Sequence, residues 1–318
     1  MRSEELISDY ISFCFAGEYI YFREYVLENK HHKCWFAKID DGKFRIIETE
    51  LEIHSIQYLK HRKKYAILIE EGKKAFKAIF AKNLDTIDFN NNIMQLPEAE
   101  SWAIEFIDTP SSLYLKTESK VYEIGEKITQ IIKRKKNYHR YSGLLELDSD
   151  KLLVKFDNDL NLYSKKRKRI KKRFYEIPQR SSWGFLSNGT IVYYDTIFTT
   201  KRDNFEINLY FINMITKYRK IIVLPYMEQN ELYIDEDIIY IKRVDSYYGK
   251  YDDLQIYNFN THEYLRLKNG NFYSCIDDLH FHENFIYLRI DYTIYKIDKV
   301  EFLQYYEKVD DSSKKRSK

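Results

Sequence analysis

Glycine, proline and cysteine are all scarce in this chain, which has 9 Gly, 4 Pro and 3 Cys among its 318 residues. The low glycine and proline contents exclude a collagen-like or Pro-rich low-complexity chain. Cys14, Cys34 and Cys275 lie far apart and form no CxxC pair, which argues against a disulfide framework. The N-terminal residues lack a secretory signal, and no run of 18 apolar residues occurs. These absences predict a cytoplasmic protein.

Aromatic residues are abundant, with 30 Tyr and 20 Phe in the chain. Aromatic and β-branched side chains suit the pleated, half-buried surface of a β-sheet. Hydrophobic residues make up 44% of the chain and charged residues 32%, so it can bury a core and remain soluble. Because glycine is scarce, we expect Asp, Asn, Lys and Ser to occupy the turns.

A short hydrophobic theme returns seven times along the chain. Its most regular part is a run such as Ile238-Ile239-Tyr240-Ile241. The seven runs are centred on Ile20, Ala66, Tyr114, Leu153, Val192, Ile239 and Ile286. The intervals between these centres are 46, 48, 39, 39, 47 and 47 residues. That period is typical of a four-stranded propeller blade, which repeats about every 40 to 50 residues.

On these repeats, the chain resembles a seven-bladed β-propeller of the WD40 or kelch kind over about residues 9–306. The resemblance is one of architecture, because neither the Gly-His and Trp-Asp pairs of WD40 repeats nor the Gly-Gly doublets of kelch repeats recur. It implies an all-β fold of seven four-stranded antiparallel blades. It also implies a binding role, since such propellers mostly bind proteins or peptides on their loop-bearing faces. A parallel β-helix or a long β-sandwich explains this period less well.

The sequence predicts one propeller domain over residues 1–306, followed by a charged, disordered tail over residues 307–318. The predicted blades lie near residues 9–49, 53–90, 101–134, 141–178, 182–224, 230–268 and 277–306. The sixth is the clearest, with strands expected at 231–234, 238–244, 254–257 and 263–267. Two modes of closure stay open: packing of the first blade on the last, or pairing of Glu4 to Ser8 outside the seventh blade.

Positive charge is concentrated in one part of the chain. The formal net charge is +3, yet residues 131–180 hold 16 Lys or Arg and 6 Asp or Glu. The peak is a basic stripe of eight cations in nine residues, which comprises Lys165, Lys166, Arg167, Lys168, Arg169, Lys171, Lys172 and Arg173. It falls at the outer strand of the fourth predicted blade. There it could protect a sheet edge from aggregation, bind a polyanion such as nucleic acid, or contact an acidic protein.

No linear catalytic motif occurs, whether a phosphate-binding loop, a GxSxG elbow, an HExxH pair or an EF-hand loop. An enzyme site on the inner strands would draw on His280, His282 and Asp278. The two histidines are too few for a metal site, and no third ligand is identifiable from the sequence. We therefore expect no cofactor and no resident metal, and a binding protein more than an enzyme.

The best predicted recognition surface is a long loop in the sixth blade in which tyrosines are bracketed by carboxylates. Tyr-rich loops offer rigid contact area at low entropic cost. The residues expected to bind a partner are Tyr247, Tyr248, Tyr251, Asp252 and Asp253. The equivalent loop of the fifth blade, residues 199–205, is expected on the same face. The sequence thus predicts a non-catalytic scaffold for a protein or peptide, with nucleic-acid binding through the basic stripe and an axial-channel enzyme as alternatives.

Overall fold

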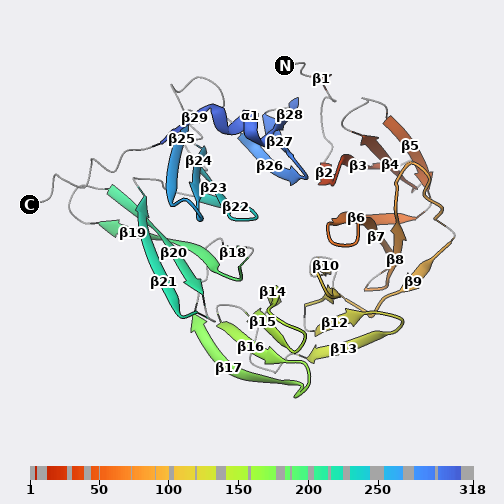
Figure 1. The fold of residues 1–318 in the computed structure, drawn as a ribbon. Coiled ribbons are helices and arrows are strands. Elements are labelled where there is room, and N and C mark those ends of the chain that lie inside the picture. Colours follow the sequence, from red (N-terminus) through yellow and green to blue (C-terminus); the bar gives the residue numbers. More distant parts are fainter. Residues whose placement is uncertain are drawn as a thin grey trace, which may run out of the picture. The chain divides into compact units, whose positions relative to one another are not determined.

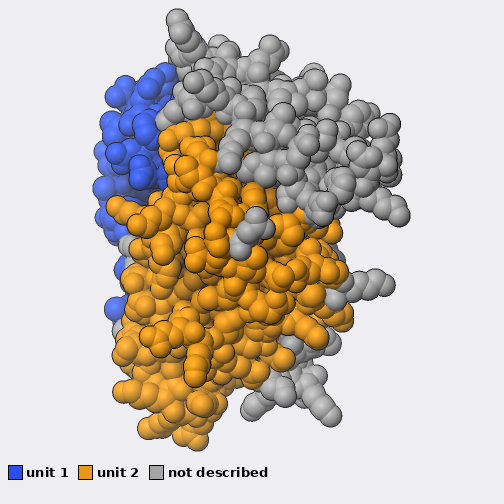
Figure 2. Space-filling model, turned by 90° about the vertical axis from the view of Figure 1, so that its right-hand side faces the viewer, with its two compact units in different colours: residues 1–8, 177–318 blue, residues 9–176 orange. Residues whose placement is uncertain are grey.

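A computed structural model gives the fold (Figure 1). The structure describes residues 4–5, 13–26, 31–38, 44–49, 51–72, 74–89, 91–99, 104–118, 120–133, 141–156, 159–176, 183–186, 188–199, 204–213, 216–224, 230–243, 254–267, 276–290 and 293–308. Strands dominate these residues, and they contain a single helix. The chain divides into two compact units, residues 1–8 with 177–318, and residues 9–176 (Figure 2).

The unit of residues 9–176 contains four sheets, each with its strands in chain order. The first holds β2 (Phe13–Ala16), β3 (Tyr19–Val26), β4 (His31–Lys38) and β5 (Phe44–Thr49). The second holds β6 (Glu52–Leu59), β7 (Lys64–Glu70), β8 (Phe76–Ala81) and β9 (Ile93–Gln95). The third holds β10 (Glu105–Asp108), β11 (Leu113–Lys116), β12 (Lys120–Ile124) and β13 (Ile128–Lys133). The fourth holds β14 (Tyr141–Glu146), β15 (Lys151–Phe156), β16 (Asp159–Ser164) and β17 (Arg169–Glu176).

The other unit contains three sheets. The fifth sheet of the chain holds β18 (Trp183–Phe185), β19 (Ile191–Thr199), β20 (Asn204–Asn213) and β21 (Tyr218–Leu224). The sixth holds β22 (Asn230–Asp235), β23 (Ile238–Arg243), β24 (Leu254–Asn258), β25 (Glu263–Leu267) and β29 (Tyr306–Lys308). The seventh holds β26 (Ile276–His282), β27 (Phe285–Ile290), β28 (Thr293–Asp298) and β1 (Glu4–Glu5). Helix α1 spans Lys299–Gln304.

All strand pairs are antiparallel, and the seven successive sheets are the blades of a seven-bladed β-propeller, as the repeat predicts. The centres of the seven repeats lie on the second strand of each sheet. Each of these centres is at most 1% exposed, which confirms the register read from the sequence: Ile20, Ala66, Tyr114, Leu153, Val192, Ile239 and Ile286. The observed strands of the sixth blade match the expected ranges within one residue.

Within each unit, the core lies between consecutive blades. Leu68 of the second blade shares a buried cluster with Phe106 and Leu115 of the third. In the other unit, Ile256 of the sixth blade shares a buried cluster with Leu288 of the seventh. A single blade exposes two apolar faces, so its burial depends on its neighbours.

Non-glycine residues occupy many left-handed positions of the hairpin turns, which accounts for the low glycine content. The a–b turns, which join the first and second strands of a blade, use Lys63, Glu236 and Glu283, with φ between 48° and 55°. The c–d turns, which join the third and fourth strands, use Lys168, Lys217 and His262, with φ between 49° and 60°. Among the described a–b and c–d turns, glycine takes a left-handed conformation only at Gly17 and Gly189.

Three segments depart from the sequence expectations. The outer strand of the second blade, β9, lies beyond residue 90, because the preceding segment folds back and buries Leu84 in the core. The last residues expected in blade seven form helix α1, since the Asp298 side chain accepts hydrogen bonds from the backbone N–H groups of Val300 and Glu301. Strand β29 pairs with β25, so the first two residues of the predicted disordered tail are in a sheet, and residues 309–318 lie outside the described residues.

The N-terminal strand β1 supplies the fourth strand of the seventh sheet. Glu4 pairs with Ile294 and Glu5 with Thr293. This is the second of the two modes of closure that the sequence left open.

The left-handed turns generate a stability prediction. Gly17→Ala should lower stability by more than about 1 kcal/mol, because φ is +60° and an added Cβ would lie 3.0 Å from Cγ of Tyr58. The reverse change at an exposed turn, Glu283→Gly, should raise stability by up to about 1 kcal/mol, because it relieves a left-handed residue with φ 50°. The midpoints of urea unfolding measure both effects. Equal midpoints for the two variants would contradict this account of the turns.

Candidate functional site

A polar residue ends the third strand of several blades and orders the turn that follows. Its side-chain oxygen accepts a hydrogen bond from the backbone N–H three residues later, at 3.0 to 3.3 Å. The residues with this role are Ser164, Asn213, Asn258 and Asp298. In blades four, six and seven, the next backbone N–H also bonds to a carbonyl of the a–b turn. The two turns of a blade therefore form one rigid end.

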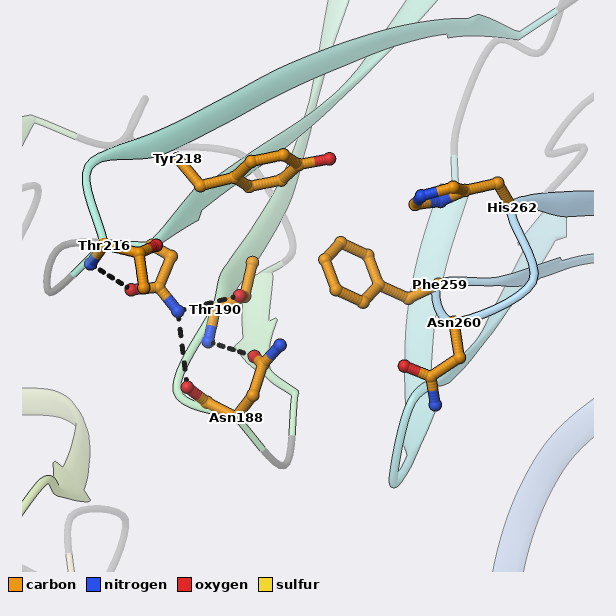
Figure 3. Close-up of a pocket in the computed structure, with 8 residues that line it drawn as sticks. Asn188, Thr190, Thr216, Tyr218, Phe259, Asn260 and His262 are labelled. Carbon is orange, nitrogen blue, oxygen red and sulfur yellow. Dashed lines mark hydrogen bonds between the residues drawn. The ribbon is translucent and has the colours of Figure 1, made fainter.

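At the turn end of blades five and six lies a groove of about 620 Å³. We name it the turn groove and define it by its lining residues: Asn188, Thr190, Asn213, Thr216, Tyr218, Phe259, Asn260 and His262 (Figure 3). The first five come from the two turns of blade five, and the last three come from the c–d turn of blade six. All eight belong to the same compact unit.

One wall of the turn groove is aromatic. The Phe259 ring stacks on buried Phe211, with ring centroids 5.3 Å apart. Tyr218 and His262 both stand nearly perpendicular to Phe259, at centroid distances of 6.1 and 5.9 Å. The Tyr257 hydroxyl lies 3.2 Å from Nδ1 of His262 and accepts a hydrogen bond from Nζ of Lys220. These contacts hold the aromatic side chains in fixed positions.

The opposite wall is polar and has no carboxylate or ammonium group in its lining. Buried Asn213 supports it, because its Nδ2 donates to Oγ1 of Thr190 at 3.2 Å and to the Asn188 carbonyl at 3.3 Å (Figure 3). Four polar groups of the lining have no partner within the described residues: Nδ2 of Asn188, Oγ1 of Thr216, Oη of Tyr218 and Oδ1 of Asn260. The turn groove therefore presents neutral donors and acceptors beside an aromatic surface.

A second feature is the c–d turn of blade four, where the basic stripe begins. Lys166, Arg167, Lys168 and Arg169 are all exposed, and none has an acidic partner within the described residues. We name these four residues the basic turn. The Asp150 carboxylate accepts a hydrogen bond from the Lys166 backbone N–H at 2.7 Å, which fixes the start of the turn. Four cations are thus displayed on an ordered hairpin.

Lys165 differs from its neighbours because its ammonium group is turned into a polar cluster between blades three and four. Its Nζ lies 3.0 Å from Oε1 of Glu146 and 3.4 Å from Oε1 of Glu123. The Glu146 side chain is only 5% exposed and also accepts hydrogen bonds from Tyr114, Thr109 and Ser111.

The carboxyl group of Glu146 stays ionised in this cluster. Burial alone would raise its pKa, but the hydrogen bonds from Ser111, Thr109, Lys165 and Tyr114 outweigh burial and lower the pKa to about 2. Burial would lower the pKa of Lys165, yet its hydrogen bond to Glu146 raises it above the ordinary value. Burial also raises the pKa of Tyr114 to about 12, so the phenol stays protonated and donates.

The other predicted site residues fall in two groups. The partner loop with Tyr247, Tyr248, Tyr251, Asp252 and Asp253 lies outside the described residues, as do most residues of the 199–205 loop. Of the basic stripe, the backbone of Lys171, Lys172 and Arg173 lies in β17, and their side chains are not described. The described strand ends on either side of this loop, Arg243 of β23 and Leu254 of β24, lie at the opposite end of these strands from the turn groove.

The suspected enzyme residues share strand β26. His280 and His282 alternate with Phe281, and Asp278 lies two residues before His280. The Asp278 carboxylate lies 3.5 Å from the hydroxyl of Tyr233. Within the described ranges, no group of three or more His, Cys, Asp or Glu side chains is placed to hold a metal ion. Among the described helical residues, no helix is long and apolar enough to cross a membrane.

The sequence reasoning missed the turn groove. Its residues are spread over 75 positions from 188 to 262 and form no linear motif. One signal was available: a polar residue recurs at the end of the third strand, at Ser164, Asn213, Asn258 and Asp298. That recurrence marks the rigid turn ends of the blades, on which the groove is built.

No family model matches the chain, and no curated protein matches it. Among solved structures, one described as Kluyveromyces lactis Hsv2 with the complete loop 6CD is similar to the chain, with a TM-score of 0.52 at 11% identity over 84% of this chain and 77% of that chain. A second Hsv2 structure of that organism has a TM-score of 0.51 at 11% identity, over 84% and 78%. At this identity the likeness concerns the fold alone. The seven antiparallel sheets themselves define the class as a seven-bladed β-propeller.

The Glu146 cluster predicts an acid-dependent loss of stability. A carboxyl group with a lowered pKa adds stability above its unfolded pKa of 4.5, and that stability is lost as the pH falls toward 2. We expect Glu146 to contribute about 3 kcal/mol to this loss. Urea unfolding between pH 5 and pH 2.5 should show a shallower decline for Glu146→Gln than for wild type. Glu126→Gln supplies the control for loss of a carboxylate, because Glu126 is exposed in the c–d turn of blade three.

Proposed function

We propose that the protein is a non-catalytic scaffold that binds a protein or peptide partner at the turn end of blades five and six. The single observation that carries this proposal is the turn groove, where Phe259, Tyr218 and His262 stand beside neutral polar groups that have no partner among the described residues. Binding sites commonly combine apolar or aromatic walls with a few fixed polar groups. The rigid turns support this role, because a pre-organised site loses little entropy on binding.

The chemistry of the turn groove favours a peptide. Asn188 Nδ2 can donate to a peptide carbonyl, and Asn260 Oδ1 can accept from a peptide N–H. The hydroxyls of Thr216 and Tyr218 can do either. An apolar side chain of the ligand would pack on Phe259, which its contact with Phe211 already supports. A charged ligand would find no opposite charge in the lining, so we propose an uncharged recognition segment.

The partner loop, which is the Tyr-rich loop of residues 245–253, stays a separate proposal for a second surface that contacts the partner. It connects Arg243 of β23 with Leu254 of β24, and these strand ends lie at the opposite end of blade six from the turn groove. Variants of the two surfaces can therefore be separated experimentally.

The test is a selection of phage-displayed random heptapeptides on the immobilised protein. Wild type should enrich a consensus of uncharged peptides with at least one large apolar residue. Phe259→Ala should weaken their binding about tenfold or more, because it removes the aromatic wall. The triple variant Tyr247→Ala, Tyr248→Ala, Tyr251→Ala should keep it. A consensus that survives Phe259→Ala and is lost in the triple variant would move the site to the Tyr-rich loop, and no consensus would contradict the proposal.

A second candidate function, polyanion binding, is favoured by the basic turn. Lys166, Arg167, Lys168 and Arg169 are exposed on an ordered hairpin and have no acidic partner within the described residues. Such a cluster can neutralise phosphates and release counterions. Lys165 is less suited to this role, because its ammonium group already contacts Glu146 and Glu123.

Salt dependence tests the second candidate. The logarithm of the affinity for a labelled 20-base-pair DNA should fall linearly with the logarithm of the salt concentration. Replacing the four residues of the basic turn by Gln should make the slope shallower by about 3 to 4, since each phosphate contact contributes about 0.9. Lys217→Gln is the control for loss of a surface cation at another c–d turn. This function would be rejected if wild type bound no DNA at any salt concentration, or if all three proteins gave the same slope.

A further inference from the structure

Strand β21 is the outer strand of blade five. In the part of the chain that the structure describes, no further strand pairs with its outer edge. It carries three of the five large hydrophobic side chains that are exposed among the described residues: Tyr218 at 37%, Ile221 at 58% and Val223 at 58%. Lys220 and Ile222 between them are partly buried, so exposure alternates along the strand. A long outer strand with exposed apolar residues can pair with another chain.

The neighbouring blade shows how such an edge is covered in this protein. Its outer strand β25 pairs with the C-terminal strand β29, which runs antiparallel with Leu265 opposite Lys308 and Leu267 opposite Tyr306. An ion pair between Glu263 and Lys308 closes the first end of this pairing. An outer strand of this unit therefore accepts one additional antiparallel strand.

The two outer strands begin in the same way but carry opposite charge. Each follows a left-handed turn residue, His262 before β25 and Lys217 before β21. On β25 the first residue is acidic and meets a lysine. The start of β21 is basic, because Lys217 and Arg219 are both exposed there. A strand like β29 would bring its own lysine to this basic end, and like charges repel.

We propose that the outer edge of β21 binds an extended segment of a partner protein by strand addition. The segment runs antiparallel to β21, has Val, Ile or Thr residues opposite Ile221 and Val223, and has carboxylates near its C-terminal end. Backbone hydrogen bonds provide the general affinity of such an added strand, and the alternating side chains provide its specificity. Lys217, which is exposed before the first residue of β21, attracts the carboxylates.

This site begins beside the turn groove, since Tyr218 belongs to both. The other residues assigned to strand binding, Lys217, Ile221 and Val223, are not part of the groove lining. It rests on the proposed function only in that the partner is a polypeptide. The turn groove takes an uncharged segment against Phe259, and the β21 edge takes an acidic, extended one. A variant of each surface therefore tests one proposal without testing the other.

The probe is a fluorescein-labelled synthetic peptide, Ser-Val-Thr-Ile-Thr-Val-Glu-Glu, whose binding to the full chain is followed by fluorescence anisotropy. We expect saturable binding and slower hydrogen exchange of the backbone amides of residues 218–224. Ile221→Lys should weaken binding about tenfold or more, because it removes an apolar contact and adds a charge. Val300→Lys is the matched control, since Val300 is exposed at 69% on α1, away from the edge. A melting temperature close to that of wild type shows that Ile221→Lys is folded.

Two further variants test direction and chemistry. Lys217→Glu should weaken the preference for carboxylates, so that replacing both Glu residues of the peptide by Lys costs less affinity for this variant than for wild type. Methylation of the alternate backbone nitrogens that face β21 should abolish binding if the strand pairs through its backbone. Phe259→Ala should leave this peptide's affinity unchanged.

Three outcomes would overturn the inference: no saturable binding, equal binding by wild type and Ile221→Lys, or no effect of peptide N-methylation. A fourth would be a wild type that binds no peptide but self-associates in sedimentation experiments, with the self-association abolished by Ile221→Lys. The edge would then pair with a second copy of the chain. None of these outcomes bears on the turn groove. Failure of the groove itself would be seen separately, as heptapeptide binding that is unaffected by Phe259→Ala.

Discussion

The packing of apolar side chains between consecutive blades is the interaction on which each unit of this structure depends. A four-stranded sheet has two faces, and in the centre of a blade both are apolar, as at Leu152, Leu153 and Val154, which are all fully buried. Neither face can be buried by the blade itself, so each blade is stable only beside its neighbours. This arrangement leaves the strand ends and the outer strands as the surfaces where the chain can vary.

The strand ends are made rigid by polar side chains. Asn213 and Asn258 each bind the backbone of the turn that follows them, and Ser164 and Asp150 join the two turns of blade four. Such bonds satisfy backbone groups that would otherwise need water. They also fix the backbone that carries Phe259 and Arg167, which suits recognition better than mobile loops would.

The outer strands are treated differently from blade to blade in the unit that contains both chain ends. Blade seven obtains its outer strand from the N-terminal end, and blade six has its outer strand covered by β29. The C-terminal segment is held there by Phe302, which is fully buried beside Tyr240 and Tyr306. Blade five has no such cover within the described residues, and its edge is the most apolar of the three.

The repeat, the strand positions and the β-propeller class could be read from the sequence, because burial on both faces requires a continuous apolar run at each blade centre. Ile239 and its six equivalents show this. The apolar run at the end of the chain was ambiguous, since Phe302 suits a strand as well as a helix, and the cap at Asp298 decided for a helix. Only tertiary structure decided which cations of the basic stripe are available to bind a polyanion. Lys165 and Lys166 are adjacent and chemically alike, but only Lys165 reaches Glu146 on another strand. The turn groove likewise exists only because folding brings Asn188 and His262 together, and no local pattern encodes a contact between residues so far apart.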